Sequence, residues 1–248
     1  MKSDLKDDYG FIEVLKIEAD KIGLSLTDKQ LIQFEEYKKL LVEWNEKINL
    51  TAITEDYEVI MKHFIDCLEI VKYIGEGSNI IDVGTGAGFP GIVIAIYFAG
   101  NVNITLLDAL NKRLLFLKEV IDKLELQNIN IVHGRAEEIA QKEEYRESYD
   151  TVVSRAVANL SVLLEYDTPY IKVNGKCLFM KGDKLQDELK EAKKALDILN
   201  CKVTNNYTYN YYINEEEYTR NILEIKKYNN TPKKYPRNYG KIKKNPLV

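Results

Sequence analysis

The spacing of apolar residues predicts a helical N-terminal region. Thr27 followed by Gln30 forms a capping box, which favours a helix that begins at this point. Apolar side chains then recur on one stripe of that helix, at Leu31, Phe34, Leu41 and Trp44. A second helix is expected over residues 57–73, where apolar residues again return at helical spacing. We therefore expect residues 1–75 to form an N-terminal helical extension.

After residue 78 the pattern changes to short β-branched runs that alternate with helical segments. Strands are expected at 79–83, 104–108, 129–133, 151–154 and 176–181. Helices are expected at 91–98, 112–124, 136–141, 160–166 and 184–199. Alternation of this kind predicts βαβ units, and hence a mostly parallel sheet that helices cover on both faces.

The last fifth of the chain reads differently. Residues 202–212 and 218–228 predict two strands that pair as an antiparallel hairpin at the edge of the sheet. The prolines among lysines after residue 231 predict an irregular closing segment. The expected organisation is a helical extension (1–75), an α/β domain (76–230) and a basic tail (231–248).

Composition narrows the class of protein. Hydrophobic residues make up 45% of the chain and charged residues 30%, and no apolar run approaches the ~20 residues that span a bilayer. The first twenty residues are too highly charged for a signal peptide. Cysteines and histidines are scattered, so neither disulfides nor a metal site is expected. We expect a cytoplasmic monomer with no membrane or metal partner.

The formal net charge of −4 conceals an asymmetry along the chain. Residues 226–248 contain eight Lys or Arg and no Asp or Glu, and removing this +8 from the total of −4 leaves −12 on the rest of the chain. A basic tail on an acidic body indicates a polyanionic partner. A solvated terminus would explain the charge equally well.

Residues 82–91 (DVGTGAGFPG) connect the first expected strand to a helix. Glycines allow positive φ and close approach of a ligand, and a helix N-terminus offers unpaired N–H groups. Gly84, Gly86 and Gly88 give the form G-x-G-x-G, but residues 86–91 also fit the dinucleotide form G-x-G-x-x-G. Asp108 ends the second strand, where an acid binds ribose hydroxyls in both cases. The loop alone therefore predicts either an S-adenosylmethionine site or a nicotinamide site.

Three features favour S-adenosyl-L-methionine as the cofactor. Asp82 precedes the loop, where methyltransferases often have an acid, and the first βα unit follows a helical extension. The hairpin at the end also matches the methyltransferase sheet better than a dinucleotide-binding sheet. We therefore predict the α/β fold of class I methyltransferases, a Rossmann-like, seven-stranded, mostly parallel sheet with an antiparallel edge hairpin.

Other candidate site residues follow the third and fourth strands and lie in the tail. The backbone of Ala136 or Glu137 is placed to bond the adenine edge, unless it is an ordinary helix start. Arg155 would meet a cofactor carboxylate or an RNA phosphate, with a surface salt bridge as the alternative. The lysines of the tail, with tyrosines between them, would bind RNA. The expected RNA contacts are Lys233, Lys234, Arg237, Lys243 and Lys244.

Several blocks occur together from residue 44 to the end. They are 44–51 (WNEKINLT), 63–68 (HFIDCL), 82–91, 107–113 (LDALNKR), 154–158 (SRAVA), 234–237 (KYPR) and 243–247 (KKNPL). In combination they resemble the bacterial small-subunit ribosomal RNA guanine-N7 methyltransferases, the family once called glucose-inhibited division protein B. The resemblance implies a guanine in a decoding-region loop of 16S ribosomal RNA as target. It implies cofactor contacts at Gly84, Phe89, Ala136, Glu137 and Arg155. Cys67 departs from the family, where serine is more frequent.

The chemistry of guanine N7 agrees with what the sequence lacks. N7 carries a lone pair and no proton, so methyl transfer needs no general base and no catalytic residue is assigned, although Arg155 is a candidate for positioning. Methyltransferases of exocyclic amines typically have an Asn/Asp-Pro-Pro-aromatic block after the fourth strand, where this chain has 154–157 (SRAV). Two alternatives stay open, a nicotinamide-dependent oxidoreductase and a non-catalytic RNA-binding assembly factor.

Overall fold

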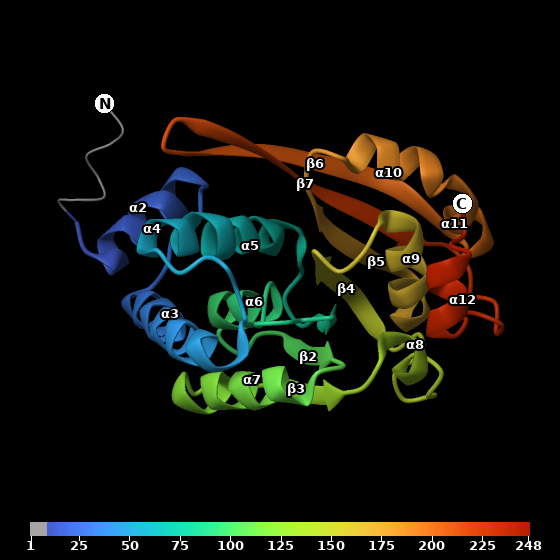
Figure 1. Ribbon diagram of the computed structural model, residues 1–248, viewed down its shortest axis with the longest axis horizontal. Coiled ribbons are helices and arrows are strands. Elements are labelled where there is room, and N and C mark those ends of the chain that lie inside the picture. Colours follow the sequence, from blue (N-terminus) through green and yellow to red (C-terminus); the bar gives the residue numbers. More distant parts are fainter. Residues whose placement is uncertain (1–8) are drawn as a thin grey trace.

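The computed structural model describes residues 9–248, and its central feature is one seven-stranded sheet (Figure 1). The strand order is β3-β2-β1-β4-β5-β7-β6. β1 to β5 are parallel, whereas β7 runs antiparallel to both β5 and β6. The strands are β1 (Asn79–Val83), β2 (Asn103–Asp108), β3 (Ile129–His133), β4 (Tyr149–Arg155), β5 (Ile171–Lys181), β6 (Cys201–Ile213) and β7 (Glu216–Lys227). The predicted parallel sheet with an antiparallel edge hairpin is confirmed.

Helices cover both faces of this sheet, because successive side chains of a strand point to opposite sides. In β1, Ile80 and Ile81 are both fully buried but belong to separate hydrophobic cores. The first core lies under α3 (Asp28–Ile48), α6 (Gly91–Phe98) and α7 (Asn111–Lys123). The second lies under α8 (Ala136–Ile139), α9 (Leu160–Asp167), α10 (Leu185–Glu191) and α11 (Lys193–Ile198).

The N-terminal helices pack on the first face. The predicted capping box of α3 is confirmed, since the Gln30 N–H donates to Thr27 Oγ1 at 3.3 Å and the Thr27 N–H donates to Gln30 Oε1 at 2.8 Å. Gln30 Nε2 also donates to the Tyr97 carbonyl at 2.7 Å. Gln30, in the first turn of α3, thus also fixes this helix to the end of α6. The helix α2 (Phe11–Lys21) packs against α3.

The expectation of one regular helix over 57–73 is wrong. The segment consists of α4 (Asp56–Val59), a π-helix η1 (Ile60–Ile65), a short α5 (Asp66–Leu68) and a 3₁₀ helix η2 (Glu69–Tyr73). A π-turn shifts the backbone hydrogen bonds of a helix. Here the Lys62 carbonyl accepts a hydrogen bond from Arg155 Nη1 at 2.9 Å, a contact with β4 that periodicity within the segment could not predict.

Two expectations near the C-terminus also need correction. The helix expected over 184–199 is divided into α10 and α11 at Ala192, whose side chain is fully buried. The closing segment is not wholly irregular, because it contains the short helix α12 (Tyr239–Lys244). It also contributes buried side chains to the fold, at Tyr235, Ile242 and Leu247. Figure 1 shows α12 beside α9.

The expected N-terminal extension begins at residue 1, but residues 1–8 lie outside the described residues. Within residues 9–248, no helix is both long enough and apolar enough to cross a membrane. In the same part of the chain, no group of three or more His, Cys, Asp or Glu side chains is arranged to hold a metal ion.

Candidate functional site

The loop between β1 and α6 has a conformation that requires glycine. φ is +71° at Gly84, +61° at Gly86 and +93° at Gly88, values that residues with a Cβ rarely adopt. The N–H groups of Gly84 and Thr85 donate to the Leu107 carbonyl at 2.9 and 3.0 Å. The loop is therefore tied to the end of β2, at the edge of the sheet where ligands bind in this fold class.

Asp82 supports the loop from inside the fold. Its side chain is fully buried, and Oδ2 accepts hydrogen bonds from Thr85 Oγ1 at 2.7 Å and from the Gly91 N–H at 2.8 Å. Oδ1 has no hydrogen-bond partner among residues 9–248. Burial raises the pKa of Asp82 to about 6. Asp82 therefore shapes the glycine loop, and it does not line the ligand pocket that is described below.

Asp108 connects the loop to the start of α7. Its Oδ2 accepts from the Gly86 N–H at 2.9 Å and from Arg113 Nη1 at 3.3 Å, and its Oδ1 accepts from the Leu110 N–H at 2.8 Å. Each carboxylate oxygen can accept more than one hydrogen bond, so these contacts leave capacity for a ribose hydroxyl. The side chain is only 4% exposed and borders the pocket described next.

A pocket of about 550 Å³ opens at the carboxyl ends of β1, β2, β3 and β4. This volume lies in the range of small-molecule sites. Of the residues predicted from the sequence, the structure brings five to its wall, namely Gly84, Asp108, Ala136, Glu137 and Lys243. Ala136 and Glu137 begin α8, where backbone N–H groups have no acceptor within the helix.

Other predicted residues lie outside this wall. Gly86 and Gly88 shape the loop without bordering the pocket. A Cβ on Gly88 would lie 2.6 Å from Ile92 Cγ1 and 2.8 Å from the Tyr37 hydroxyl, so this glycine lets the loop pack against the helices. Phe89 and Arg155 also lie outside the wall, and they contact the N-terminal extension instead.

The contacts of Phe89 and Arg155 form one buried cluster with His63. The Phe89 ring stacks on His63 with centroids 4.5 Å apart, and the Arg155 guanidinium lies 4.8 Å from the Phe89 centroid. Arg155 Nη1 lies 3.2 Å from Asp66 Oδ2. Burial and the nearby Arg155 charge lower the pKa of His63 to about 3, which keeps the imidazole neutral. Arg155 thus holds the extension against the end of β4.

The residues after Arg155 turn into the pocket. Ala156 has φ of +57°, an unfavourable conformation for a residue with a Cβ. It lines the pocket together with Val157 and Ala158. A Cβ on Gly84 would lie 3.0 Å from Val157 Cγ2, so the glycine loop and the end of β4 approach closely. Within the block 154–158 the sequence predicts a site role only for Arg155, so these three residues are additions to the predicted site.

Two tyrosines of the pocket wall were also missed, Tyr166 from α9 and Tyr239 from α12. Tyr166 falls on a periodic helix and reads as a core residue. From its neighbours in the chain, Tyr239 is predicted to be one of the tyrosines of an RNA-binding tail. No local signal could have found either one, because the long-range packing of α9 and α12 alone brings them to the strand ends.

The predicted RNA contacts of the tail differ in exposure. Lys233, Lys234, Lys243 and Lys244 are exposed. Arg237 instead binds the fully buried carboxylate of Glu165, with Nε and Nη2 donating to its two oxygens at 2.8 and 2.7 Å. An arginine that neutralises a buried acid anchors the tail to α9, which sets it apart from the exposed lysines.

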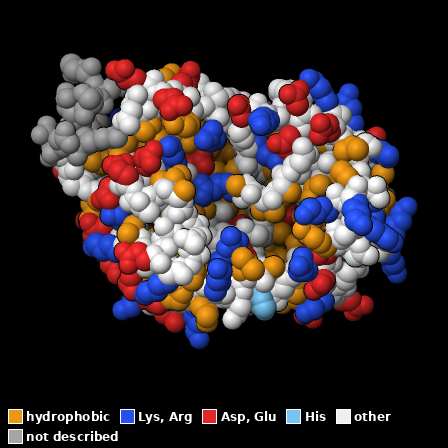
Figure 2. Space-filling model, viewed as in Figure 1, with side chains coloured by type: hydrophobic (Ala, Val, Ile, Leu, Met, Phe, Trp, Pro, Cys, Tyr) orange, Lys and Arg blue, Asp and Glu red, His pale blue; other side chains and the backbone are white. Residues whose placement is uncertain are grey.

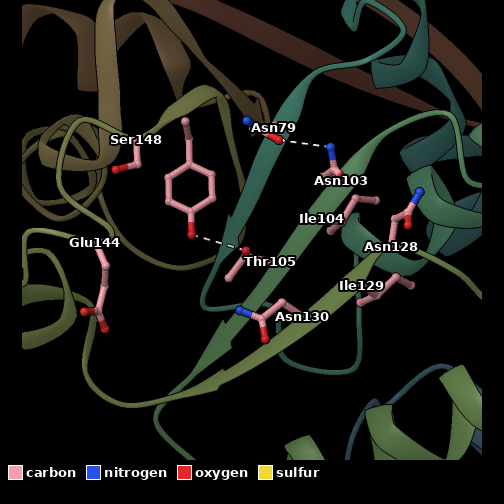
Figure 3. A pocket seen from close by; sticks show the side chains of 10 residues that line it. Asn79, Asn103, Ile104, Thr105, Asn128, Ile129, Asn130, Glu144 and Ser148 are labelled. Carbon is pink, nitrogen blue, oxygen red and sulfur yellow. Dashed lines mark hydrogen bonds between the residues drawn. The ribbon is translucent and has the colours of Figure 1, made fainter.

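A second hollow, of about 460 Å³, lies at the amino ends of the parallel strands (Figure 3). Its polar side chains bond to one another, since Asn103 Nδ2 donates to Asn79 Oδ1 at 3.1 Å and the Tyr149 hydroxyl donates to Thr105 Oγ1 at 3.2 Å. Ligands of open α/β sheets bind at the carboxyl ends of the strands. The pocket at the glycine loop is therefore the candidate cofactor site.

Two solved structures share this fold at low sequence identity. TYW2 of M. jannaschii, solved in complex with AdoMet, matches 71% of this chain with 79% of its own, at 14% identity and a TM-score of 0.53. TrmN of Thermus thermophilus matches 66% of this chain with 48% of its own, at 13% identity and a TM-score of 0.51. At such low identity these likenesses concern the fold alone, and they agree with the predicted class I methyltransferase fold.

Sequence comparison gives a closer relationship. The chain is 46% identical over 239 residues to the ribosomal RNA small subunit methyltransferase G of Clostridium tetani, covering 96% of this chain and 99% of that protein. It is 46% identical over 236 residues to the protein of the same name from Alkaliphilus metalliredigens, covering 94% and 98%. The GidB family model, described as rRNA small subunit methyltransferase G, matches residues 30–214. The chain therefore belongs to the family of the rRNA small subunit methyltransferase G.

Proposed function

We propose that this protein transfers the methyl group of S-adenosylmethionine to N7 of a guanine in 16S ribosomal RNA. The observation that carries the proposal is the pocket at the carboxyl ends of β1 to β4, bordered by Gly84 and by the carboxylate of Asp108. This arrangement occurs in a chain that belongs to a family of ribosomal RNA methyltransferases. Fold and family together favour S-adenosylmethionine over the nicotinamide cofactors that the loop pattern also allows.

The pocket has the groups that S-adenosylmethionine requires. A Cβ at Gly84 would narrow the space toward Val157, so this glycine leaves room for a ligand at the end of β1. Asp108 would accept hydrogen bonds from ribose hydroxyls, and the first N–H groups of α8 would donate to the adenine edge. When bound, S-adenosylmethionine supplies an electrophilic methyl group. The part of this chain is to bind and orient the reactants.

The positions of His63, Asp82 and Tyr166 are consistent with a reaction without a general base. His63 and Asp82 are both buried in contacts that maintain the fold, and neither lines the pocket. Tyr166 does line it, but burial raises its pKa to about 12, so it stays neutral at physiological pH. Guanine N7 has a lone pair and no proton to lose. Orientation of two bound reactants can supply ~7–11 kcal/mol of the barrier reduction, which suits such a site.

Basic and aromatic side chains provide surfaces for RNA. The exposed lysines of the tail that lie outside the pocket wall, Lys233, Lys234 and Lys244, would bind phosphates. On the β6–β7 hairpin, the Arg220 guanidinium lies 5.5 Å from the centroid of the partly exposed Tyr218, whose other neighbour, the Tyr211 ring at 5.4 Å, is buried. Figure 2 shows a hollow near the centre of one face with Lys and Arg side chains around it. Such surfaces suit a single-stranded or looped RNA, in which unstacked bases are accessible.

Methylation of small ribosomal subunits tests the proposal. Subunits that lack the modification are incubated with labelled S-adenosylmethionine, and their RNA is treated with borohydride and aniline, which cleave at N7-methylguanine. We expect incorporation and cleavage at one guanine, and neither with a Gly84→Val variant. Incorporation without cleavage would refute N7 as the target. A folded protein that binds the cofactor but transfers no methyl group would instead be an assembly factor.

The same assay with naked 16S RNA separates RNA recognition from subunit recognition. The salt dependence of RNA binding then tests the tail. Each phosphate contact that is removed should lower the slope of log affinity against log salt by about 0.7–0.9. Lys233→Ala should show this change, whereas Lys142→Ala, an exposed lysine outside the tail, should not. Equal slopes for the wild type, Lys233→Ala and Lys142→Ala would exclude Lys233 as a phosphate contact.

A further inference from the structure

The C-terminal segment does more than carry positive charge, because it forms part of the cofactor pocket. Tyr239 and Lys243, both in α12, line the same pocket as Gly84 and Asp108, although they follow Asp108 by more than 130 positions in the sequence. The segment therefore reaches the carboxyl ends of the strands from outside the α/β domain. The C-terminal segment can form a fixed wall of the pocket only if it is anchored to the α/β domain.

Several hydrogen bonds anchor the segment that leads into α12. Arg237 binds Glu165 through its side chain and also through its backbone N–H, which donates to Oε1 at 2.8 Å. Arg146 Nη1 donates to the Tyr235 carbonyl at 2.9 Å, and Gln141 Nε2 donates to the Pro236 carbonyl at 2.8 Å. Within α12, Ile242 is fully buried. The helix is thus held in place on both sides of Tyr239.

The ring of Tyr239 lies toward the end of β3. The Arg135 guanidinium, two residues beyond β3, lies 4.8 Å from the Tyr239 centroid, and Lys243 Nζ lies 5.7 Å from it. The ring is nevertheless 43% exposed. Leu110 and Val157, which also line the pocket, are 44% and 37% exposed. An apolar wall around an open pocket suits a flat, weakly polar ligand group such as a purine.

We propose that Tyr239 forms the adenine-side wall of the cofactor pocket, so that the C-terminal segment is a cofactor-binding element of this enzyme. The inference rests on the proposed function for the identity of the ligand. Ala136 and Glu137, which border the pocket from the same side as Arg135, would meet the adenine edge, and the Tyr239 ring would contact its face. The positively charged Arg135 and Lys243 beside the ring keep the phenol in position through cation–π contacts.

Calorimetric titration with two ligands tests this assignment. S-adenosylmethionine probes the whole pocket, and 5′-methylthioadenosine, which lacks the amino acid part, probes the nucleoside end. Tyr239→Ala should weaken both ligands by the same factor, roughly three- to tenfold, because the lost contact is to the adenine. Tyr239→Phe, which keeps the ring, should bind both ligands within about twofold of wild type. Tyr228→Ala, at an exposed tyrosine outside the pocket, is the matched control.

The outcomes of these titrations distinguish a failure of this inference from a failure of the proposed function. Unchanged affinity of Tyr239→Ala for both ligands, with a wild type that binds S-adenosylmethionine, overturns the inference and leaves the proposed function intact. A loss confined to S-adenosylmethionine would place Tyr239 at the amino acid end and also overturn it. Absence of binding by the folded wild type would overturn the proposed cofactor, and this inference with it. Thermal unfolding of each variant checks that the protein is folded. Substitution of the partly exposed Tyr239 should not change the fold.

Discussion

Replacing Asp82 with Asn should make the stability of the protein, relative to wild type, increase with pH. The Asp82 carboxyl is fully buried beneath the glycine loop, and its Oδ1 has no hydrogen-bond partner among residues 9–248. Burial raises its pKa from 3.8 to about 6, against hydrogen bonds from Thr85 and Gly91 that favour the charged form. At ~1.36 kcal/mol per pKa unit, this shift corresponds to about 3 kcal/mol.

The sign follows from proton binding. The folded state binds the Asp82 proton more tightly than the unfolded state does, so the free energy of unfolding contributed by this group is highest at low pH. It decreases as the pH rises from about 4 to about 6, where the folded carboxyl ionises. The amide of Asp82→Asn does not titrate, and its oxygen can still accept from Thr85 and Gly91. The stability of the variant relative to wild type should therefore increase by about 3 kcal/mol over this interval.

Urea unfolding at a series of pH values between about 4 and 7.5 measures this difference. Asp167 is a second buried carboxyl, and its pKa is raised by burial and also by the charge of Asp82. Replacing Asp82 therefore lowers the pKa of Asp167 as well, which adds to the measured difference with the same sign. Asp187→Asn is a control of opposite sign, because a hydrogen bond from Lys190 lowers the pKa of the exposed Asp187. Its relative stability should fall, not rise, with pH. Parallel pH profiles for Asp82→Asn and wild type would refute the argument from burial.

Three further substitutions test the loop and the hairpin. Gly84→Val should abolish measurable S-adenosylmethionine binding, because its side chain would meet Val157 at the pocket wall. Gly77→Val is the control, since Gly77 has a similar positive φ but open space around it, and this variant should lose stability without losing affinity for the cofactor. Gly91→Ala should lower the free energy of unfolding by roughly 1–3 kcal/mol, since its Cβ would lie 2.8 Å from an oxygen of Asp82, as urea titration would show. Lys227→Met should lower the free energy of unfolding by about 3 kcal/mol or more, because the fully buried ammonium donates to Glu147 at 2.6 Å and to two backbone carbonyls. A second substitution that replaces Glu147 with a neutral residue should restore part of this free energy. An unchanged midpoint for Gly91→Ala or Lys227→Met would contradict these contacts.

The amino-acid sequence by itself determined most of the elements and their order along the chain. Strand periodicity located β1 and β3 to the residue, and the capping box located the start of α3, because these signals depend only on neighbouring residues. The glycine loop was equally local, since glycines that follow a strand allow the left-handed backbone that such a loop needs. The alternation of strands and helices then left a parallel sheet as the natural arrangement.

Tertiary structure alone decided which further residues join the site and which predicted residues are held away from it. Arg155 ends a strand that the sequence located well, but the π-helix and Asp66 bind its side chain away from the pocket. Tyr239 belongs to a segment that looked like a solvated basic terminus, yet the pairing of Arg237 with Glu165, 72 positions earlier, brings it to the pocket wall. Periodicity and motifs describe what a residue does among its neighbours in the chain. Contacts between residues distant in sequence depend on how all the elements pack, and no local pattern encodes them.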